Sequence, residues 1–317
     1  MPSSFSTSLP SGPTVRTATE CGLAALWLLA AASPLQAQTV FACEPEWAAL
    51  TRVLLPKATV HVATHAHQDP HHIEARPALI AQLRSADAAI CTGASLEAGW
   101  LPMLRQRAGN AAVQDGAPGM FYAASAVTLI DARPGAGGSP FAGDVHAEGN
   151  PHLHTDPHRL LQVASAWSQR LQQLFPAQAT AVAQRQMRFE SDWRKNMARW
   201  EQQAAPLRGS SVVAQHASFA YLWNWLGLRQ VADLEPRPGL APTPGHLQSL
   251  LDRLKSRPPR AVVVTGFQNP RAGRWLTEQL GDQVPLLQLP ASPEDTIAPE
   301  ALERWMDGLV SALSRVP

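Results

Sequence analysis

The sequence predicts an α/β protein with two lobes, each built on a parallel sheet flanked by helices and joined by a long, rigid connecting helix. Short apolar runs rich in β-branched residues alternate with helical patterns, and this alternation occurs twice along the chain. A long polar helical stretch separates the two occurrences. Because parallel strands need a crossover connection, strands that alternate with helices indicate βαβ units.

The individual elements follow in order along the chain. Predicted strands are Thr39–Cys43, Thr59–Ala63, Ala88–Cys91, Val212–Gln215 and Ala261–Thr265, and predicted helices are Pro77–Ser85, Gly245–Lys255 and Arg271–Leu280. The connecting stretch runs from about residue 156 to 204 and is interrupted near Pro176. Its second half, Ala177–Gln203, would be ~40 Å long at 1.5 Å per residue. We therefore expect an N-terminal lobe over 38–157, a connecting segment over 158–207 and a C-terminal lobe over 208–317.

Composition narrows the class of protein. The 317 residues suit two domains and carry 26 Lys and Arg against 25 Asp and Glu, a net charge of +1. Nucleic-acid-binding domains usually show a clear basic excess, so we expect no nucleic-acid partner. Only 3 Cys are present, which excludes a multi-cysteine zinc protein or a disulfide scaffold.

The N-terminus predicts an export signal. Gly22–Pro34 is an apolar run of the length of a secretory signal core, and a cleavage site follows after Ala37. We therefore assign residues 1–37 to a signal peptide and expect a periplasmic protein. After cleavage two cysteines remain, Cys43 and Cys91, and the sequence leaves open whether they form a disulfide or stay as buried thiols.

The histidines are distributed unevenly. Nine of the 11 lie between His61 and His158. Three occupy distinct loop settings that follow apolar strands: His71, His152 and His216. Imidazole nitrogen is a preferred ligand of Zn²⁺ and Cu²⁺, and these three would form a metal site if the fold brought them together. Each of them alone also fits a structural or surface histidine.

Three motifs resemble a known family. Asp69-Pro-His-His-Ile-Glu-Ala-Arg-Pro77 with the following Ala86–Pro102 segment, then Asn150-Pro-His-Leu-His-Thr-Asp-Pro157, then Gln215-His-Ala-Ser-Phe-Ala-Tyr-Leu222, occur in order. They resemble the histidine motifs of zinc- and manganese-type substrate-binding proteins of ABC transporters, the ZnuA/TroA-like cluster A-I family. The resemblance covers nearly the whole mature chain.

The resemblance implies one metal ion held between the lobes by His71, His152 and His216. Their neighbours His72 and His154 are less expected as ligands. Side chains one residue apart in an extended loop, such as those of His71 and His72, point in opposite directions, and His154 lies where the family usually has tryptophan. The family's fourth ligand is commonly an Asp or Glu in the C-terminal lobe, after the last strand. In this chain that strand is Pro285–Ser292, which has no carboxylate at the usual place. Candidates for the fourth position are Glu294, Asp295, Asp69 or water.

The implied function is capture of a divalent transition metal and delivery to an ABC permease in the inner membrane, by a monomer with no catalytic residues. A scarcity of carboxylates favours Zn²⁺ over Mn²⁺, which prefers oxygen ligands. The alternative is a secreted zinc hydrolase, since three histidines and a water also form catalytic sites. The sequence, however, lacks the His-Glu-x-x-His motif of zinc metalloproteases. A metal-dependent adhesin built on the same fold is a third hypothesis.

The remaining residues near these motifs have open roles. His61, His65 and His67 are expected in exposed positions, although His65 and His67 could form a weak secondary metal site. His146 lies six residues before His152 and could line the same cleft. The expected carboxylates that orient the ligand rings are Asp144, Asp156 and Glu74.

Overall fold

The computed structural model describes residues 4, 6–9, 12, 37–132 and 146–316. The chain from Ala37 onward forms one compact unit. The apolar run of the expected signal peptide and the Gly/Pro-rich segment around residues 134–143 lie outside the described residues.

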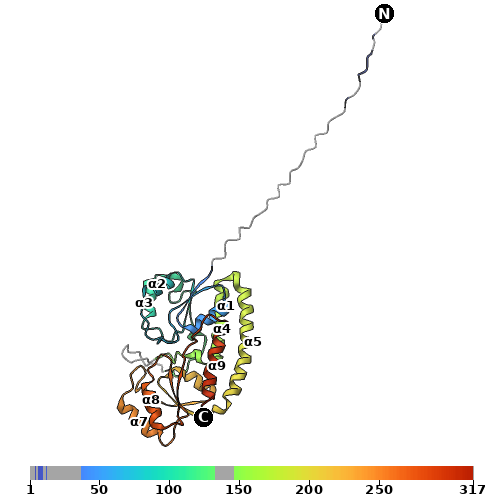
Figure 1. Ribbon diagram of the computed structural model, residues 1–317. Coiled ribbons are helices and arrows are strands. Elements are labelled where there is room, and N and C mark those ends of the chain that lie inside the picture. The colour runs from blue at the N-terminus through green and yellow to red at the C-terminus, as the bar shows by residue number, and fades with distance from the viewer. Residues whose placement is uncertain (1–3, 5, 10–11, 13–36, 133–145, 317) are drawn as a thin grey trace. The chain divides into compact units, whose positions relative to one another are not determined.

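Two four-stranded parallel sheets form the framework (Figure 1). The first contains β1 (Thr39–Ala42), β2 (Thr59–Val62), β3 (Ala88–Cys91) and β4 (Met120–Tyr122) in the order β2-β1-β3-β4. The second contains β5 (Ser211–Ala214), β6 (Arg229–Asp233), β7 (Ala261–Thr265) and β8 (Leu286–Leu289) in the order β6-β5-β7-β8. The predicted architecture of two parallel sheets flanked by helices is confirmed, and the two sheets share one topology.

Nine α-helices lie within the described part of the chain, several of them on the faces of the sheets. They are α1 (Pro45–Leu54), α2 (Pro77–Arg84), α3 (Leu101–Ala108), α4 (Pro157–Leu174), α5 (Ala179–Ala204), α6 (Ala220–Leu226), α7 (Pro244–Leu254), α8 (Arg271–Leu280) and α9 (Ala301–Ser314). Four of them begin with proline, whose fixed φ suits the first helical position and whose missing N–H costs nothing there. None of the helices that the structure describes is long and apolar enough to cross a membrane.

The connecting segment consists of α4 and α5, separated by a short turn at Pro176–Gln178. Helix α5 has 26 residues and packs against α1, α4 and α9, as Figure 1 shows. Its buried face includes Trp193 and Trp200, and the Trp193 indole donates to the Pro157 carbonyl at 3.0 Å.

One apolar core runs through both sheets and the connecting helices. It joins residues of β1 and α1 to residues of β5, β7 and α9 by way of α4 and α5. A smaller cluster fills the other face of each sheet. The two sheets therefore share one continuous apolar core.

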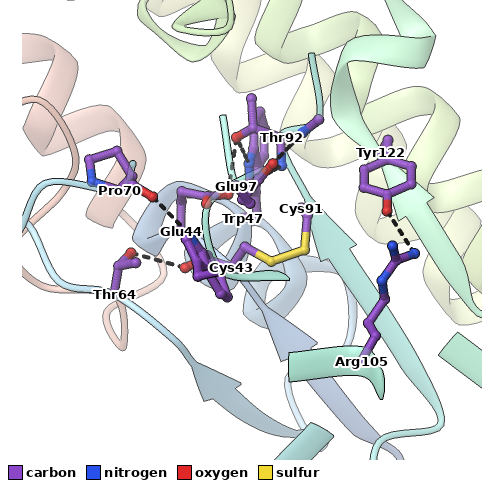
Figure 2. The surroundings of a disulfide bond; sticks show 12 residues. Cys43, Glu44, Trp47, Thr64, Pro70, Cys91, Thr92, Glu97, Arg105 and Tyr122 are labelled. Atoms are coloured by element: carbon purple, nitrogen blue, oxygen red, sulfur yellow. Dashed lines mark hydrogen bonds between the residues drawn. A yellow bond between two sulfur atoms is a disulfide. The ribbon is translucent and has the colours of Figure 1, made fainter. Parts of the chain in front are cut away.

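The two cysteines left after the expected cleavage form a disulfide (Figure 2). Cys43 follows β1 and Cys91 ends β3, and these strands are hydrogen-bonded neighbours whose cysteine Cα atoms lie 4.8 Å apart. The question that the sequence left open is answered in favour of the disulfide, which ties together the carboxyl ends of two strands.

Candidate metal centre

Three histidines from different parts of the chain converge on one point. His71 lies in the loop after β2, His152 lies just before a 3₁₀ turn (Leu153–Thr155) that leads into α4, and His216 is the second residue after β5. Their ligand atoms all lie within 4.8 Å of one another, and each residue is at most 8 % exposed. The ring centroids are 5.5 Å apart for His71 and His152, 5.9 Å for His71 and His216, and 5.6 Å for His152 and His216.

The His71 ring is held by a neighbouring carboxylate. Asp69 Oδ1 accepts the His71 backbone N–H at 3.0 Å and lies 2.7 Å from His71 Nδ1. The Trp100 indole donates to the Pro70 carbonyl at 2.9 Å. This bond attaches the loop that carries His71 to the residue just before α3. With Nδ1 directed at Asp69, the Nε2 atom of His71 is the one available to a metal.

His152 sits in a hydrogen-bond network that joins the two lobes. Its backbone N–H donates to Asn150 Oδ1 at 2.9 Å, and the Asn150 amide donates to the Ala217 carbonyl at 2.9 Å. The Tyr221 hydroxyl donates to the Asn150 carbonyl at 2.6 Å. One asparagine therefore links the backbone of His152 to the residue that follows His216.

The His216 ring is held in the same way as that of His71. Its Nδ1 lies 2.9 Å from Glu235 Oε2, and this carboxylate also accepts the Gly239 N–H at 2.8 Å. Glu235 is 10 % exposed at its side chain. A carboxylate behind a ligating imidazole fixes the tautomer and raises the basicity of the ligand nitrogen, as in many metal sites.

The electrostatics favour the neutral imidazole of His152, the form that binds metal. Burial, and then the neighbouring His71 and His216, hold the pKa of His152 well below its usual value. Burial tends to raise the pKa of Asp69, but its hydrogen bonds with His71 outweigh that effect and lower it. A cavity of about 320 Å³ borders the cluster and is lined by Asp69, His71, His216, Glu235 and the loop around Gly239.

Comparison with known families now decides the class of protein. The model of the family described as "ZnuA: Zinc-uptake complex component A periplasmic" matches residues 40–316. This chain belongs to the ZnuA family. Members are periplasmic metal-binding components of ABC uptake systems, which bind a solute and perform no catalysis. The assignment decides against the hydrolase alternative.

Solved structures share the fold. A crystal structure of ZnuA is 19 % identical, with 88 % of this chain and 99 % of that chain covered and a TM-score of 0.72. A deletion mutant of ZnuA with bound zinc is 18 % identical, with 88 % and 98 % covered and a TM-score of 0.71. FpvC from Pseudomonas aeruginosa in complex with Mn²⁺ is 19 % identical, with 87 % and 98 % covered and a TM-score of 0.69. No curated protein matches the chain in sequence.

The carboxylates suggested for the fourth position lie elsewhere. Glu294 is exposed and pairs with His67 at 3.3 Å, and Asp295 pairs with Arg304 at 2.7 Å while capping the following backbone. Asp69 faces Nδ1 of His71. Among the described residues, none of these carboxylates belongs to the group of ligand atoms that converge within 4.8 Å.

The two neighbouring histidines do not belong to the group of converging ligand atoms among the described residues. His72 is exposed in the same loop as His71. His154 is buried, with Nε2 at 2.9 Å from the Ala291 carbonyl and Nδ1 at 3.2 Å from Glu46, and its ring stacks on Trp305. It therefore occupies a core position, where the sequence motif of the family usually has tryptophan.

The other histidines are dispersed. His61 lies in β2, and His65 and His67 lie in the exposed part of the following loop with ring centroids 6.4 Å apart. His146 differs, because its Nε2 lies 3.2 Å from Nε2 of His71.

Glu235 is the residue of the centre that sequence reasoning missed. The orienting carboxylates expected at Asp156 and Glu74 are not found in that role, because Asp156 caps α4 and Glu74 is exposed, and Asp144 lies outside the described residues. The signal for Glu235 was its place just past β6, an edge strand whose alternating burial was not recognised. Because β6 pairs with β5 in parallel, Glu235 and His216 emerge at the same edge of the sheet.

Proposed function

We propose that this protein captures Zn²⁺ through His71, His152 and His216 and delivers it to an ABC permease in the inner membrane. One observation carries the proposal: three buried imidazoles, contributed by both lobes of a ZnuA-family chain, have ligand atoms within 4.8 Å of one another. Two of the rings are oriented by carboxylates, as ligating histidines usually are.

The donor set supports zinc over manganese. Zn²⁺ is well served by imidazole nitrogen in a tetrahedral site, whereas Mn²⁺ prefers carboxylate and water oxygens. In the described residues the converging atoms are nitrogens, and the carboxylates Asp69 and Glu235 lie behind the rings. The Mn²⁺ complex of FpvC shows that the fold itself does not set the metal.

A titration tests this proposal. The purified protein is stripped of metal and titrated with Zn²⁺ against a competing chelator, with Mn²⁺ and Cu²⁺ in parallel. We expect one equivalent of Zn²⁺ to bind tightly, Mn²⁺ to bind much more weakly, and His152→Ala to abolish tight binding. Cu²⁺ is expected to bind at least as tightly as Zn²⁺, since it stands higher in the affinity series for nitrogen ligands.

The matched control is His158→Ala, a histidine that is 53 % exposed at its side chain and pairs with Glu201. It should leave Zn²⁺ affinity unchanged. Tight Mn²⁺ binding with weak Zn²⁺ binding would overturn the choice of metal. Zinc binding that survives His152→Ala would overturn the site.

The shared core bears on how the metal is captured and released. Because one apolar core joins both sheets through α4 and α5, we propose that the lobes (38–157 and 208–317) keep their relative orientation and that the connecting segment (158–207) acts as a brace. Crystal structures with and without Zn²⁺ should then differ in the loops that carry the histidines. A large rigid-body rotation of one sheet against the other would contradict this.

We also propose that residues 1–37 are a signal peptide and that the protein works as a monomer in the periplasm. Expression of the full chain in a Gram-negative host should give a periplasmic product that starts at Gln38, as read by mass spectrometry. An uncleaved chain in the cytoplasmic fraction would contradict the export proposal.

A further inference from the structure

His146 approaches the metal-facing atom of a proposed ligand. Its Nε2 lies 3.2 Å from Nε2 of His71, and the two ring centroids are 5.2 Å apart with 29° between the ring planes. Since Asp69 engages Nδ1 of His71, the contact with His146 is made at the nitrogen that is left for a metal.

The spacing between His71 and His146 fits two ligands of one ion. His146 lies outside the group of three histidines whose ligand atoms are within 4.8 Å of one another, so a bound ion has to draw its Nε2 atom toward His152 and His216. Two nitrogens that each lie about 2.0–2.1 Å from the same tetrahedral zinc are about 3.3 Å apart. The observed 3.2 Å between the Nε2 atoms agrees with that value. The centroid separation of 5.2 Å likewise equals the spacing of about 5 Å expected for two imidazoles bound through Nε2 to one tetrahedral ion.

The segment from His146 to His152 is anchored along its length. The Gly149 N–H donates to the His146 carbonyl at 3.3 Å, and the Ser95 hydroxyl donates to Glu148 at 3.1 Å. Gly149 has φ +132° and packs so closely on Leu129 that a Cβ there would lie 2.6 Å from its side chain. These contacts hold the backbone of His146 at a fixed distance from that of His152.

The carboxylates nearest the centre already have other roles. Asp69 and Glu235 each face the Nδ1 atom of a histidine ring, and Glu294 and Asp295 form surface ion pairs. Two negative charges thus stand directly behind the imidazoles, where they balance the charge of a divalent ion without binding it.

We propose that His146 supplies the fourth ligand, so that the ion is held by four imidazole nitrogens from His71, His146, His152 and His216. This inference rests on the proposed function and replaces a carboxylate or water at the fourth position. A site of four neutral nitrogens discriminates further against Mn²⁺, which prefers oxygen ligands.

X-ray absorption spectroscopy of the zinc-loaded protein tests the proposal, because outer-shell scattering counts imidazole ligands. The wild-type spectrum should show four imidazoles, and that of His146→Ala three imidazoles and one oxygen. Competition titration should give a Zn²⁺ dissociation constant raised on the order of 100-fold in His146→Ala, which is at least as large as the loss caused by removing a group that only orients a ligand. His146→Asp, which restores a ligand, should recover part of the affinity and bind Mn²⁺ better than wild type does.

The control is His72→Ala, an exposed histidine beside His71, which should match wild type in spectrum and affinity. Thermal unfolding of the metal-free variants separates ligand loss from misfolding. The wild-type spectrum tests the number of imidazole ligands without any substitution. A wild-type site of three imidazoles and one oxygen would overturn the proposal, as would an unchanged spectrum and affinity in His146→Ala. The proposed function is tested separately, by zinc binding in wild type and its loss in His152→Ala.

Discussion

Asn150 connects the two halves of the metal centre, and its removal should weaken both the fold and metal binding. Its side chain is the shared partner of the His152 backbone N–H and of the Ala217 carbonyl, both at 2.9 Å. The residue is 7 % exposed, so water cannot readily replace these bonds. The perturbation is Asn150→Ala, which removes both bonds and leaves a donor and an acceptor without their partner.

The magnitude follows from those two groups. A buried donor or acceptor that loses its partner costs about 1–3 kcal/mol, so two such groups lower the free energy of unfolding of the metal-free protein by about 2–6 kcal/mol. The same bonds align the segments that carry His152 and His216. Loss of such support typically costs about 10–100-fold in metal affinity, and we expect at least the lower value for Zn²⁺.

The assays are urea unfolding of the metal-free protein and chelator competition for Zn²⁺. Asn110→Ala is the matched control, because the Asn110 amide also bridges two carbonyls, those of Leu83 and Ala86 at 3.0 and 2.7 Å, in a part of the first lobe without a proposed ligand. It should destabilise the protein comparably and leave Zn²⁺ affinity unchanged. If Asn150→Ala lost stability but bound Zn²⁺ as tightly as wild type, the bridge would hold the fold and not the site.

Three more predictions follow from the described contacts. Glu235→Gln should raise the Zn²⁺ dissociation constant about 10–100-fold in chelator competition, because the carboxylate orients and polarises His216. Reduction of the Cys43–Cys91 bond, which spans 48 residues, should lower the free energy of unfolding by up to about 4 kcal/mol in urea titrations. Burial raises the pKa of Glu97 from 4.5 to about 7, so the folded state holds a proton that the unfolded state has lost in this range. Stability should therefore fall as pH rises from about 4.5 to 7, by roughly 3 kcal/mol at most, and Glu97→Gln should remove its share of this slope.

Each of these has a result that would contradict it. Glu278→Gln, on the exposed surface of α8, controls for the loss of one negative charge and should not change Zn²⁺ affinity. An equal effect of both variants would mean that Glu235 acts by general electrostatics. A denaturation midpoint that is the same before and after reduction would contradict the disulfide prediction. Unfolding free energies that rise between pH 4.5 and 7 in wild type, relative to Glu97→Gln, would contradict the assignment of a protonated Glu97.

The sequence predicted the two sheets and the connecting helices because their patterns are strong. Ala88–Cys91 and Ala261–Thr265 are fully buried runs, and the stretch from α4 to α5 is broken at Pro176 as proline requires. It missed β4 and β6. The first has only three residues, and the second is an edge strand whose outward side chains are polar, so neither shows the continuous apolar run of a central parallel strand.

The candidate centre was predictable only in part. His71, His152 and His216 were found because each lies in a recognisable motif, and the structure brings them together. Glu235 was not assigned a role, and His146 was expected only to line the cleft, because their positions depend on strand pairing and on how the segment before His152 folds back. Such relations between segments distant in sequence leave no local pattern to read.

The arrangement of the centre has a consequence for metal exchange. The histidines come from loops at sheet edges, while the sheets themselves share an apolar core that includes the fully buried Trp167, Trp193 and Trp200. Opening the site by separating the lobes would expose part of that core to water, at about 25 cal/mol for each Å² of apolar surface. Moving a loop breaks a few hydrogen bonds, each with a net contribution of about 1 kcal/mol. The less costly way to open the site is therefore to move the loops that carry the histidines.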